Sequence, residues 1–278
     1  MAFDLVAQGE RIDDDSIAAL ARSSGSPRWR RIAPGAARFF DARRGPDVDE
    51  LCARLALDCA YVPDAARLSD YGLVAMDMDS TLITIECIDE LADMAGIKTQ
   101  VAAITASAMR GEIDFAESLT RRTALLAGLH ASALERVWSE RLKLSPGAER
   151  LVEALRARGI KTLLVSGGFT FFTERLKARL GLDYALSSEP EIAGGRLTGR
   201  ILGRILDARG KAEAVRGMRE SLGLATERVV AIGDGANDLA MLSEAGVSIA
   251  YHAKPVVQRQ ASFSFNHVGL DGLLNLFP

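Results

Sequence analysis

Four short runs of apolar residues, each followed by glycine or polar residues, constrain the fold of this chain most. They occupy residues 73–76, 162–165, 229–232 and 247–251. Unbroken apolar runs of this length are typical of strands that are buried on both faces of a parallel sheet. Stretches with the spacing of amphipathic helices lie between them. This alternation of strand and helix predicts a doubly wound α/β domain.

The interval between the first two runs is too long for a simple crossover. A right-handed connection between parallel strands needs one helix, and residues 146–158 have the pattern of that helix. The excess, about residues 86–143, has helical spacing of apolar positions, which predicts a helical insertion. An insertion after the first strand lies over the carboxyl end of the sheet, where such folds bind ligands. We therefore expect a cap or lid over a site.

Composition excludes several other classes of protein. The chain has 278 residues, of which 48% are hydrophobic and 26% charged, which is ordinary for a folded globular protein. A net charge of −3 gives no reason to expect binding to nucleic acid. No uncharged apolar run approaches the roughly 20 residues of a membrane-spanning helix, and residues 1–10 do not have the pattern of a signal peptide. These features predict a soluble, cytoplasmic protein.

The cysteines and histidines are few. The cysteines are Cys52, Cys59 and Cys87, an odd number, which argues against a disulfide framework. The three histidines are scattered along the chain, which argues against a zinc cluster. We therefore expect the cysteines to be reduced.

The first seventy residues have a different pattern from the remainder. Residues 37–40 are strand-like and residues 48–57 helical, which predicts a small α/β module. The basic cluster at residues 28–31 is interpreted as a solvated loop, with contact to phosphate or nucleic acid as the lesser alternative. Residues 62–70, which include a proline, are interpreted as a linker.

Aspartates follow two of the predicted strands. Asp77 and Asp79 come after the first strand, and side chains two apart on an extended segment point the same way. Two adjacent carboxylates predict an acid and base pair or a metal site; the alternative is a turn with two solubilising aspartates. Asp234 and Asp238 follow the third strand. Carboxylates without nearby histidine or cysteine favour Mg²⁺ over zinc, although an acidic helix start would have the same pattern.

Small and basic residues fall at the same predicted sheet edge. Ser166 and two glycines end the second strand, where backbone N–H groups can bind an anion; a plain turn is the alternative. Lys211 is near the start of the helix before the third strand, where exposed lysines are common. Because these groups and the aspartates converge at one edge, they predict a site for a phosphate, a cation and a nucleophile.

Two charged residues belong to the predicted insertion. Arg122 follows Leu119 by three residues and Phe115 by seven, so it shares their apolar helix face. An arginine there either extends its stem along apolar surface or directs its guanidinium into a pocket. Glu86 is either a favourable acid at a helix start or a ligand-binding group.

In this order, these motifs resemble the haloacid dehalogenase superfamily of phosphatases, and within it the phosphoserine phosphatases. The resemblance covers about residues 70–278 and implies a HAD-like Rossmannoid sheet with a helical cap. Its motifs are Asp77-Met78-Asp79-Ser80-Thr81, Glu86-Cys87-Ile88-Asp89-Glu90-Leu91, Ser166-Gly167-Gly168-Phe169, Gly233-Asp234-Gly235-Ala236-Asn237-Asp238 and Ala253-Lys254-Pro255.

The resemblance implies a role for each matching residue. Asp77 would be the nucleophile that accepts the phosphoryl group, and Asp79 the general acid and base. Mg²⁺ would be held by the Asp77 carboxylate, the Asp79 backbone carbonyl and Asp234, with Asp238 bracing the metal site. Further residues would bind the substrate: Ser166, Gly167, Lys211 and Asn237 its phosphoryl group, Glu86 its ammonium and Arg122 its carboxylate.

The activity implied is Mg²⁺-dependent hydrolysis of O-phospho-L-serine, the last step of a route to L-serine. One alternative is a related phosphomonoesterase or phosphotransferase, for example on phosphohomoserine. Another is an amino-acid or phosphate sensor that kept the fold without catalysis. The resemblance also implies that residues 1–70 are a reduced form of the amino-acid-sensing, ACT-like module of bacterial relatives, and it allows a homodimer. No nucleic-acid or membrane partner is expected.

Overall fold

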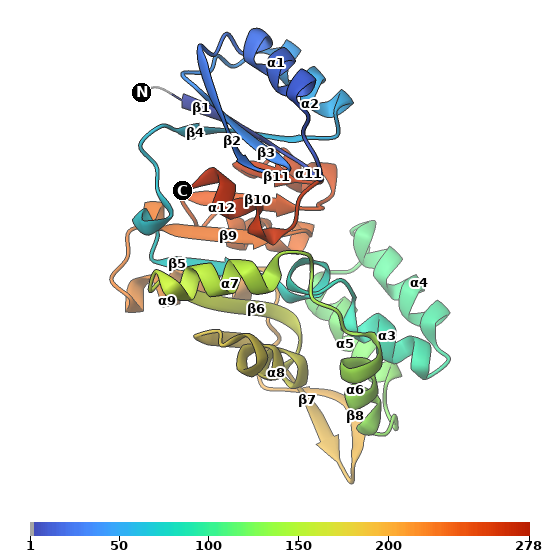
Figure 1. Cartoon of the computed structure of the whole chain (residues 1–278). Helices are drawn as coiled ribbons and strands as arrows, with labels where there is room; N and C mark the ends of the chain where they lie inside the picture. The colour runs from blue at the N-terminus through green and yellow to red at the C-terminus, as the bar shows by residue number, and fades with distance from the viewer. Residues whose placement is uncertain (1–2) are drawn as a thin grey trace.

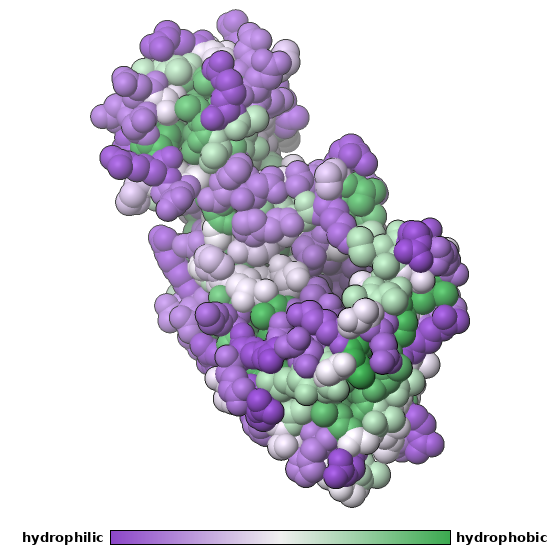
Figure 2. Space-filling model, turned by 90° about the vertical axis from the view of Figure 1, so that its right-hand side faces the viewer, coloured by the Kyte–Doolittle hydropathy of each residue, from purple (hydrophilic) through white to green (hydrophobic). Residues whose placement is uncertain are grey.

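The computed structural model describes residues 3–278 and contains two β-sheets. The N-terminal sheet lies at one end of the molecule, the larger sheet in the middle, and a group of helices beside it (Figure 1). In the space-filling view the N-terminal residues form a lobe set apart from the larger body (Figure 2).

The N-terminal module is an antiparallel sheet of strand order β2-β3-β1-β4 with two helices on one face (Figure 1). Residues such as Leu5, Ile17 and Phe39 are buried between the sheet and the helices. Its elements are β1 (Phe3–Gln8), α1 (Asp14–Ser23), β2 (Arg28–Ala33), β3 (Ala36–Phe40), α2 (Pro46–Arg54) and β4 (Asp58–Pro63).

Two expectations for this module were wrong in detail. The basic cluster at 28–31 is not a loop but part of β2, an exposed edge strand. Charged residues on an edge strand keep its free side solvated, which is why this strand resembles a loop in sequence. The expected linker begins later than predicted, because Val62 and Pro63 end β4, and Leu68 within it is fully buried.

The larger sheet confirms the predicted doubly wound α/β fold. Its strand order is β11-β10-β9-β5-β6-β7-β8, and all neighbouring strands are parallel except β7 and β8. The predicted first and fourth strands have the observed bounds. The strands are β5 (Leu73–Met76), β6 (Lys161–Phe169), β7 (Tyr184–Ala193), β8 (Arg196–Leu202), β9 (Val229–Gly233), β10 (Val247–Tyr251) and β11 (Phe263–Phe265).

Helices cover both faces of this sheet. Val74 and Met76 of β5 face one apolar layer, whereas Leu73 and Ala75 face the other, as the alternation of a strand requires. The first layer includes α7 (Ala148–Ala157) and α8 (Thr170–Leu180), and the second α9 (Ala208–Ser221) and α10 (Leu239–Leu242). Within residues 3–278, no helix is long and apolar enough to cross a membrane.

The predicted helical insertion is present and lies beside the carboxyl ends of the strands (Figure 1). Backbone hydrogen bonds join its middle to β8: Gly128 N donates to Leu197 O over 2.8 Å, and Leu197 N donates to Leu129 O over 2.9 Å. One part of the cap is therefore fixed to the core sheet. The cap comprises α3 (Cys87–Met94), α4 (Lys98–Met109), α5 (Phe115–Leu125), α6 (Ser132–Arg136) and η3 (Val137–Arg141).

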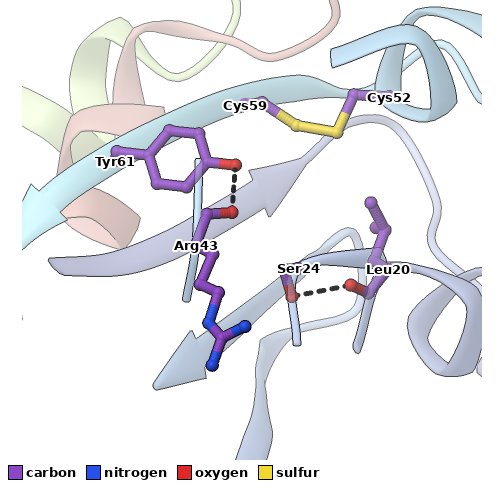
Figure 3. The surroundings of a disulfide bond; sticks show 6 residues. All are labelled: Leu20, Ser24, Arg43, Cys52, Cys59 and Tyr61. Carbon is purple, nitrogen blue, oxygen red and sulfur yellow. Dashed lines mark hydrogen bonds between the residues drawn. A yellow bond between two sulfur atoms is a disulfide. The ribbon is translucent and has the colours of Figure 1, made fainter. Parts of the chain in front are cut away.

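A disulfide joins Cys52 to Cys59, so the expectation of three reduced cysteines was wrong (Figure 3). Cys52 lies near the end of α2 and Cys59 near the start of β4, and the tight connection between these elements brings their Cα atoms to 6.4 Å. An odd number of cysteines excludes complete pairing but allows this single local pair. Cys87 is free and buried.

Buried polar groups attach the N-terminal module to the core. Arg38 is 3% exposed, and its Nη1 lies 3.1 Å from Asp4 Oδ2. Its Nη2 donates to the Leu276 carbonyl over 2.6 Å, close to the end of α12 (Leu273–Leu276). Asp58 in β4 accepts hydrogen bonds of 2.8 Å from the backbone N–H groups of Asn266 and His267, just after β11. These contacts fix the module beside the core edge strand β11.

The first prediction concerns this buried ion pair. Arg38→Met leaves the buried Asp4 carboxylate without its cation, so we expect the free energy of unfolding to fall by about 3 kcal/mol. The double variant Asp4→Leu, Arg38→Met removes both charges and should recover most of that loss. Urea denaturation of the wild type, both single variants and the double variant measures the coupling. Additive losses would show that the pair is not coupled.

Candidate active site

A cavity of about 540 Å³ lies between the cap and the carboxyl ends of β5, β6, β9 and β10. It contains nearly all the residues that the sequence analysis selected, although they are dispersed over the chain. Those lining it are Asp77, Asp79, Glu86, Arg122, Ser166, Gly167, Lys211, Asp234 and Asn237. Asp238 is fully buried and does not line the cavity.

The floor of the cavity is built around one buried ammonium group. Lys211 is 1% exposed and lies in α9, which packs against the sheet. Its Nζ is 2.6 Å from Asp77 Oδ1 and 2.7 Å from Asp238 Oδ1. Although burial alone would lower the pKa of Lys211, the carboxylates of Asp238 and Asp77 raise it above its ordinary value. Lys211 therefore stays charged and holds Asp77 in place.

Asp77, Asp234 and Asp238 form a cluster of carboxylates, each offering an oxygen within 4.8 Å of the other two. Burial and the neighbouring Asp238 raise the pKa of Asp77 well above its ordinary value and that of Asp234 to about 6. Asp238 Oδ2 already accepts the backbone N–H groups of Asp234 and Gly235. Asp238 thus braces the loop, while the other two carboxylates remain suited to a hard cation.

Asp79 has different surroundings from Asp77, although both line the cavity. The backbone is still extended at Asp79, with φ −66° and ψ 135°, and it turns at Ser80, where φ is +56°. Both aspartates are therefore on extended backbone and line the cavity, as their spacing predicted. Asp79 Oδ1 accepts the backbone N–H of Cys87 over 3.0 Å, at the start of α3. Burial raises the pKa of Asp79, and the hydrogen bond from this N–H only partly opposes the rise. The raised pKa allows the Asp79 carboxyl group to carry a proton.

Ser166 and Gly167 lie at the irregular end of β6. The strand continues to Phe169 through a shift of register, and α8 begins only at Thr170. Gly168 N donates to Ser166 Oγ over 2.9 Å, which leaves the serine O–H available to a ligand. A Cβ atom at Gly167 would lie 2.5 Å from the Phe115 ring, so glycine is required for the cap to approach the core.

Opposite charges line the cap side of the cavity. The Arg122 side chain is 11% exposed, and its Nε is a buried donor without a hydrogen-bond partner among the described residues. Glu86 Oε1 accepts a hydrogen bond of 2.8 Å from Ser80 Oγ, and burial, followed by the Asp79 charge, raises the pKa of Glu86 to about 8. An unsatisfied buried arginine donor is costly, so this end of the cavity is suited to an anionic ligand group.

Sequence reasoning missed three polar residues of this region. Asp89 lines the cavity with Oδ1 at 4.0 Å from Arg122 Nη1, and Lys254 also lines it. Thr81 Oγ1 donates to Asp234 Oδ1 over 3.2 Å and so orients that carboxylate. Asp89 is three residues past Glu86, a helical spacing that would have placed both acids on one face.

Comparison with known proteins identifies the group to which this site belongs. Residues 74–243 match the haloacid dehalogenase-like hydrolase family. A phosphoserine phosphatase of Polaromonas sp. is 53% identical over 215 residues, which are 76% of this chain and 91% of the relative. The chain belongs to the phosphoserine phosphatase family of the haloacid dehalogenase-like hydrolases.

The fold of this chain is also similar to those of solved phosphoserine phosphatase structures. A probable phosphoserine phosphatase from Vibrio cholerae, in unliganded form, superposes with a TM-score of 0.87 and 35% identity, covering 99% of this chain and 86% of its own. A phospho-aspartyl intermediate analogue of a phosphoserine phosphatase superposes with a TM-score of 0.70 and 36% identity, covering 75% of this chain and 99% of its own. Family members thus include a shorter protein that matches about three quarters of this chain.

The second prediction concerns the buried ammonium group. Lys211→Met leaves Asp77 and Asp238 buried without their cation, which should lower the free energy of unfolding by about 3–5 kcal/mol near pH 8. A carboxyl group whose pKa is raised in the folded state binds its proton more tightly than in the unfolded chain, so its contribution to stability falls as the pH rises above its ordinary value. The loss in the variant should therefore be smaller near pH 5.

Urea unfolding at both pH values measures this difference. Lys177→Met is the matched control, because Lys177 is paired with Glu174 on an exposed helix face. The control should change stability by less than about 1 kcal/mol at either pH. A loss in Lys211→Met that does not depend on pH would contradict the proposed electrostatic origin.

Proposed function

We propose that this chain hydrolyses O-phospho-L-serine to L-serine and phosphate through an aspartyl phosphate on Asp77. The observation that carries the proposal is the distribution of charge in one cavity: Lys211 and the carboxylates at its floor, and Arg122 and Glu86 on its cap side. A phosphate ester needs the first set, and a zwitterionic amino acid needs the second. Family membership supports the same reaction.

In the first half-reaction, Asp77 attacks the phosphorus atom of the substrate. Lys211 holds Oδ1 and so orients Oδ2 for attack. A bond forms between this oxygen and phosphorus, and the bond between phosphorus and the serine oxygen breaks. Asp79 donates its proton to the departing oxygen, for which its raised pKa is suited. Serine alkoxide is a poor leaving group, so this proton is required in the transition state.

In the second half-reaction, water hydrolyses the aspartyl phosphate. Asp79, now ionised, accepts a proton from the water as its oxygen attacks phosphorus, and the bond to Asp77 breaks. Phosphate leaves, and both aspartates return to their starting states. The Ser166 hydroxyl, the Gly167 N–H, Lys211 and Asn237 would stabilise the negative charge on the phosphoryl oxygens in both steps.

A divalent cation, for which we propose Mg²⁺, would be held by the Asp77 carboxylate, the Asp79 backbone carbonyl and Asp234. The donors fit this ion, because they are all oxygens and because Asp77 and Asp234 are buried beside a third carboxylate, Asp238, so that burial and the charge of Asp238 raise the pKa of both. The ion would supply charge neutralisation for the attack of one anion on another. Asp238 would not bind the ion but would hold the loop that carries Asp234, by accepting a hydrogen bond from the Asp234 backbone N–H.

Recognition of serine would depend on the cap. Arg122 would bind the substrate carboxylate with its free N–H groups, and Glu86 would bind the ammonium. Phe115 and Met109, which also line the cavity, would exclude water from the phosphate. Simple sugar phosphates carry neither charge and would lack these contacts.

Further proposals concern the pathway, the cellular location, the assembly and the domain division of this chain. The activity would complete a route to L-serine in the cytoplasm, and the assembly would be a homodimer. We also propose the division into a module at 1–70 and a core at 71–278 with its cap at 86–143. The ACT-like interpretation of the module is supported by its β-α-β-β-α-β order.

The third prediction tests the substrate. Phosphate release should be fastest from O-phospho-L-serine with Mg²⁺ and should be abolished by a chelator and restored by added Mg²⁺. Arg122→Ala should lower kcat/KM for this substrate by about 10- to 100-fold, the value of a lost charged hydrogen bond. The same variant should change kcat/KM less than about threefold for phosphoethanolamine and p-nitrophenyl phosphate, which have no carboxylate.

Arg121→Ala is the matched control, because Arg121 directly precedes Arg122 on the same helix and pairs with Glu117 on the exposed face. It should leave all three substrates unaffected. Equal losses on all substrates in Arg122→Ala would contradict carboxylate recognition. Faster release from phosphohomoserine than from phosphoserine would instead identify the alternative substrate.

A further inference from the structure

Lys254 is a charged residue of the cavity to which the proposed mechanism assigns no role. It lies three residues past the end of β10, and residues at or just past the ends of β5, β6 and β9 (Asp77, Gly168 and Asp234) also line the cavity. Lys254 is exposed and is therefore at the rim, whereas Lys211 is buried at the floor. Within residues 3–278 it makes no side-chain hydrogen bond or ion pair.

The backbone before Lys254 is held in an uncommon conformation. His252 has φ +45°, which is unfavourable for a residue with a side chain, and its N–H donates to the Phe265 carbonyl over 2.7 Å. The Gln258 side chain donates to the Ala253 carbonyl over 2.6 Å, and Ala253 is buried. Strained backbone persists where the surroundings fix it, and it often occurs at functional positions. Here it fixes the direction in which the chain presents Lys254.

The charges that line the cavity suggest what Lys254 could bind. Acidic side chains outnumber basic ones in its lining, so a phosphate dianion that approaches the rim is favoured by a cation placed there. Lys211 is engaged with two carboxylates, and Arg122 lies beside Asp89. Lys254 is the cation without such a neighbour in the described lining. The acids are Asp77, Asp79, Glu86, Asp89, Asp114 and Asp234.

We propose that Lys254 binds the phosphate group of the incoming ester at the rim and accelerates its entry. Its ligands are phosphate monoesters and inorganic phosphate, whatever the organic group attached. The identity of the ester rests on the proposed function, but binding of phosphate does not. Because the contact is exposed to solvent, it should be strong at low ionic strength and screened at high ionic strength.

Steady-state kinetics with Lys254→Gln test this contact. At an ionic strength of about 0.02 M, kcat/KM should fall by about 3- to 10-fold, with most of the loss in KM, and at about 0.5 M by less than about twofold. Phosphoserine and p-nitrophenyl phosphate should lose equally, because both carry the phosphate. Lys254→Arg retains the charge and should recover most of the loss. Lys177→Gln makes the same change of net charge on α8, outside the cavity lining, and should behave as the wild type.

Calorimetric titration with inorganic phosphate provides a readout that needs no turnover. Affinity should be about 3- to 10-fold weaker in Lys254→Gln than in the wild type at low ionic strength. A loss confined to phosphoserine, a loss that salt does not reduce, or unchanged phosphate affinity would each overturn the inference. Weakened phosphate binding without hydrolysis of phosphoserine would support the inference while contradicting the proposed function.

Discussion

The ion pairs of Lys211 are the interaction on which the site depends. A fully buried ammonium is tolerated only because Asp77 and Asp238 each place an oxygen within 2.7 Å of it. These three residues come from different parts of the chain, and the strand order of the sheet brings them together. Asp238 in turn fixes the loop that carries Asp234. The positions of the proposed nucleophile and of the proposed metal site thus follow from one buried charge.

The carboxyl groups of the cavity differ because their partners differ. Asp77 faces an ammonium, Asp79 faces the N–H at the start of a helix, and Glu86 faces a serine hydroxyl. Burial raises the pKa of all three. Within one pocket, these differences fit the roles proposed for Asp77 as a nucleophile, for Asp79 as an acid that keeps its proton and for Glu86 as a ligand of the ammonium.

Much of this arrangement was predictable from sequence, and the limits have physical reasons. Apolar runs identified β5, β6, β9 and β10 but not β7, β8 and β11. The polar residues after the identified strands indicated the sheet edge, because parallel strands bring their carboxyl ends together. The burial of Lys211 was not predictable from its own neighbours, since the partners that stabilise it are distant in sequence. The Cys52–Cys59 pair and the edge strand β2 depend on local packing that residue counts do not reveal. Asp89 and Lys254 were visible within motifs, but only the cavity shows that they share it with the other charges.

The most direct test of the account is the covalent state of Asp77 during turnover. The wild-type protein, mixed with O-phospho-L-serine and Mg²⁺ and quenched in acid, would be digested and analysed by tandem mass spectrometry. The account predicts the added mass of one phosphoryl group on the Asp77 side chain, and its absence in Asp77→Asn. A phosphoryl group on Asp79, Ser80 or any other residue, or turnover without a phosphorylated enzyme, would contradict it.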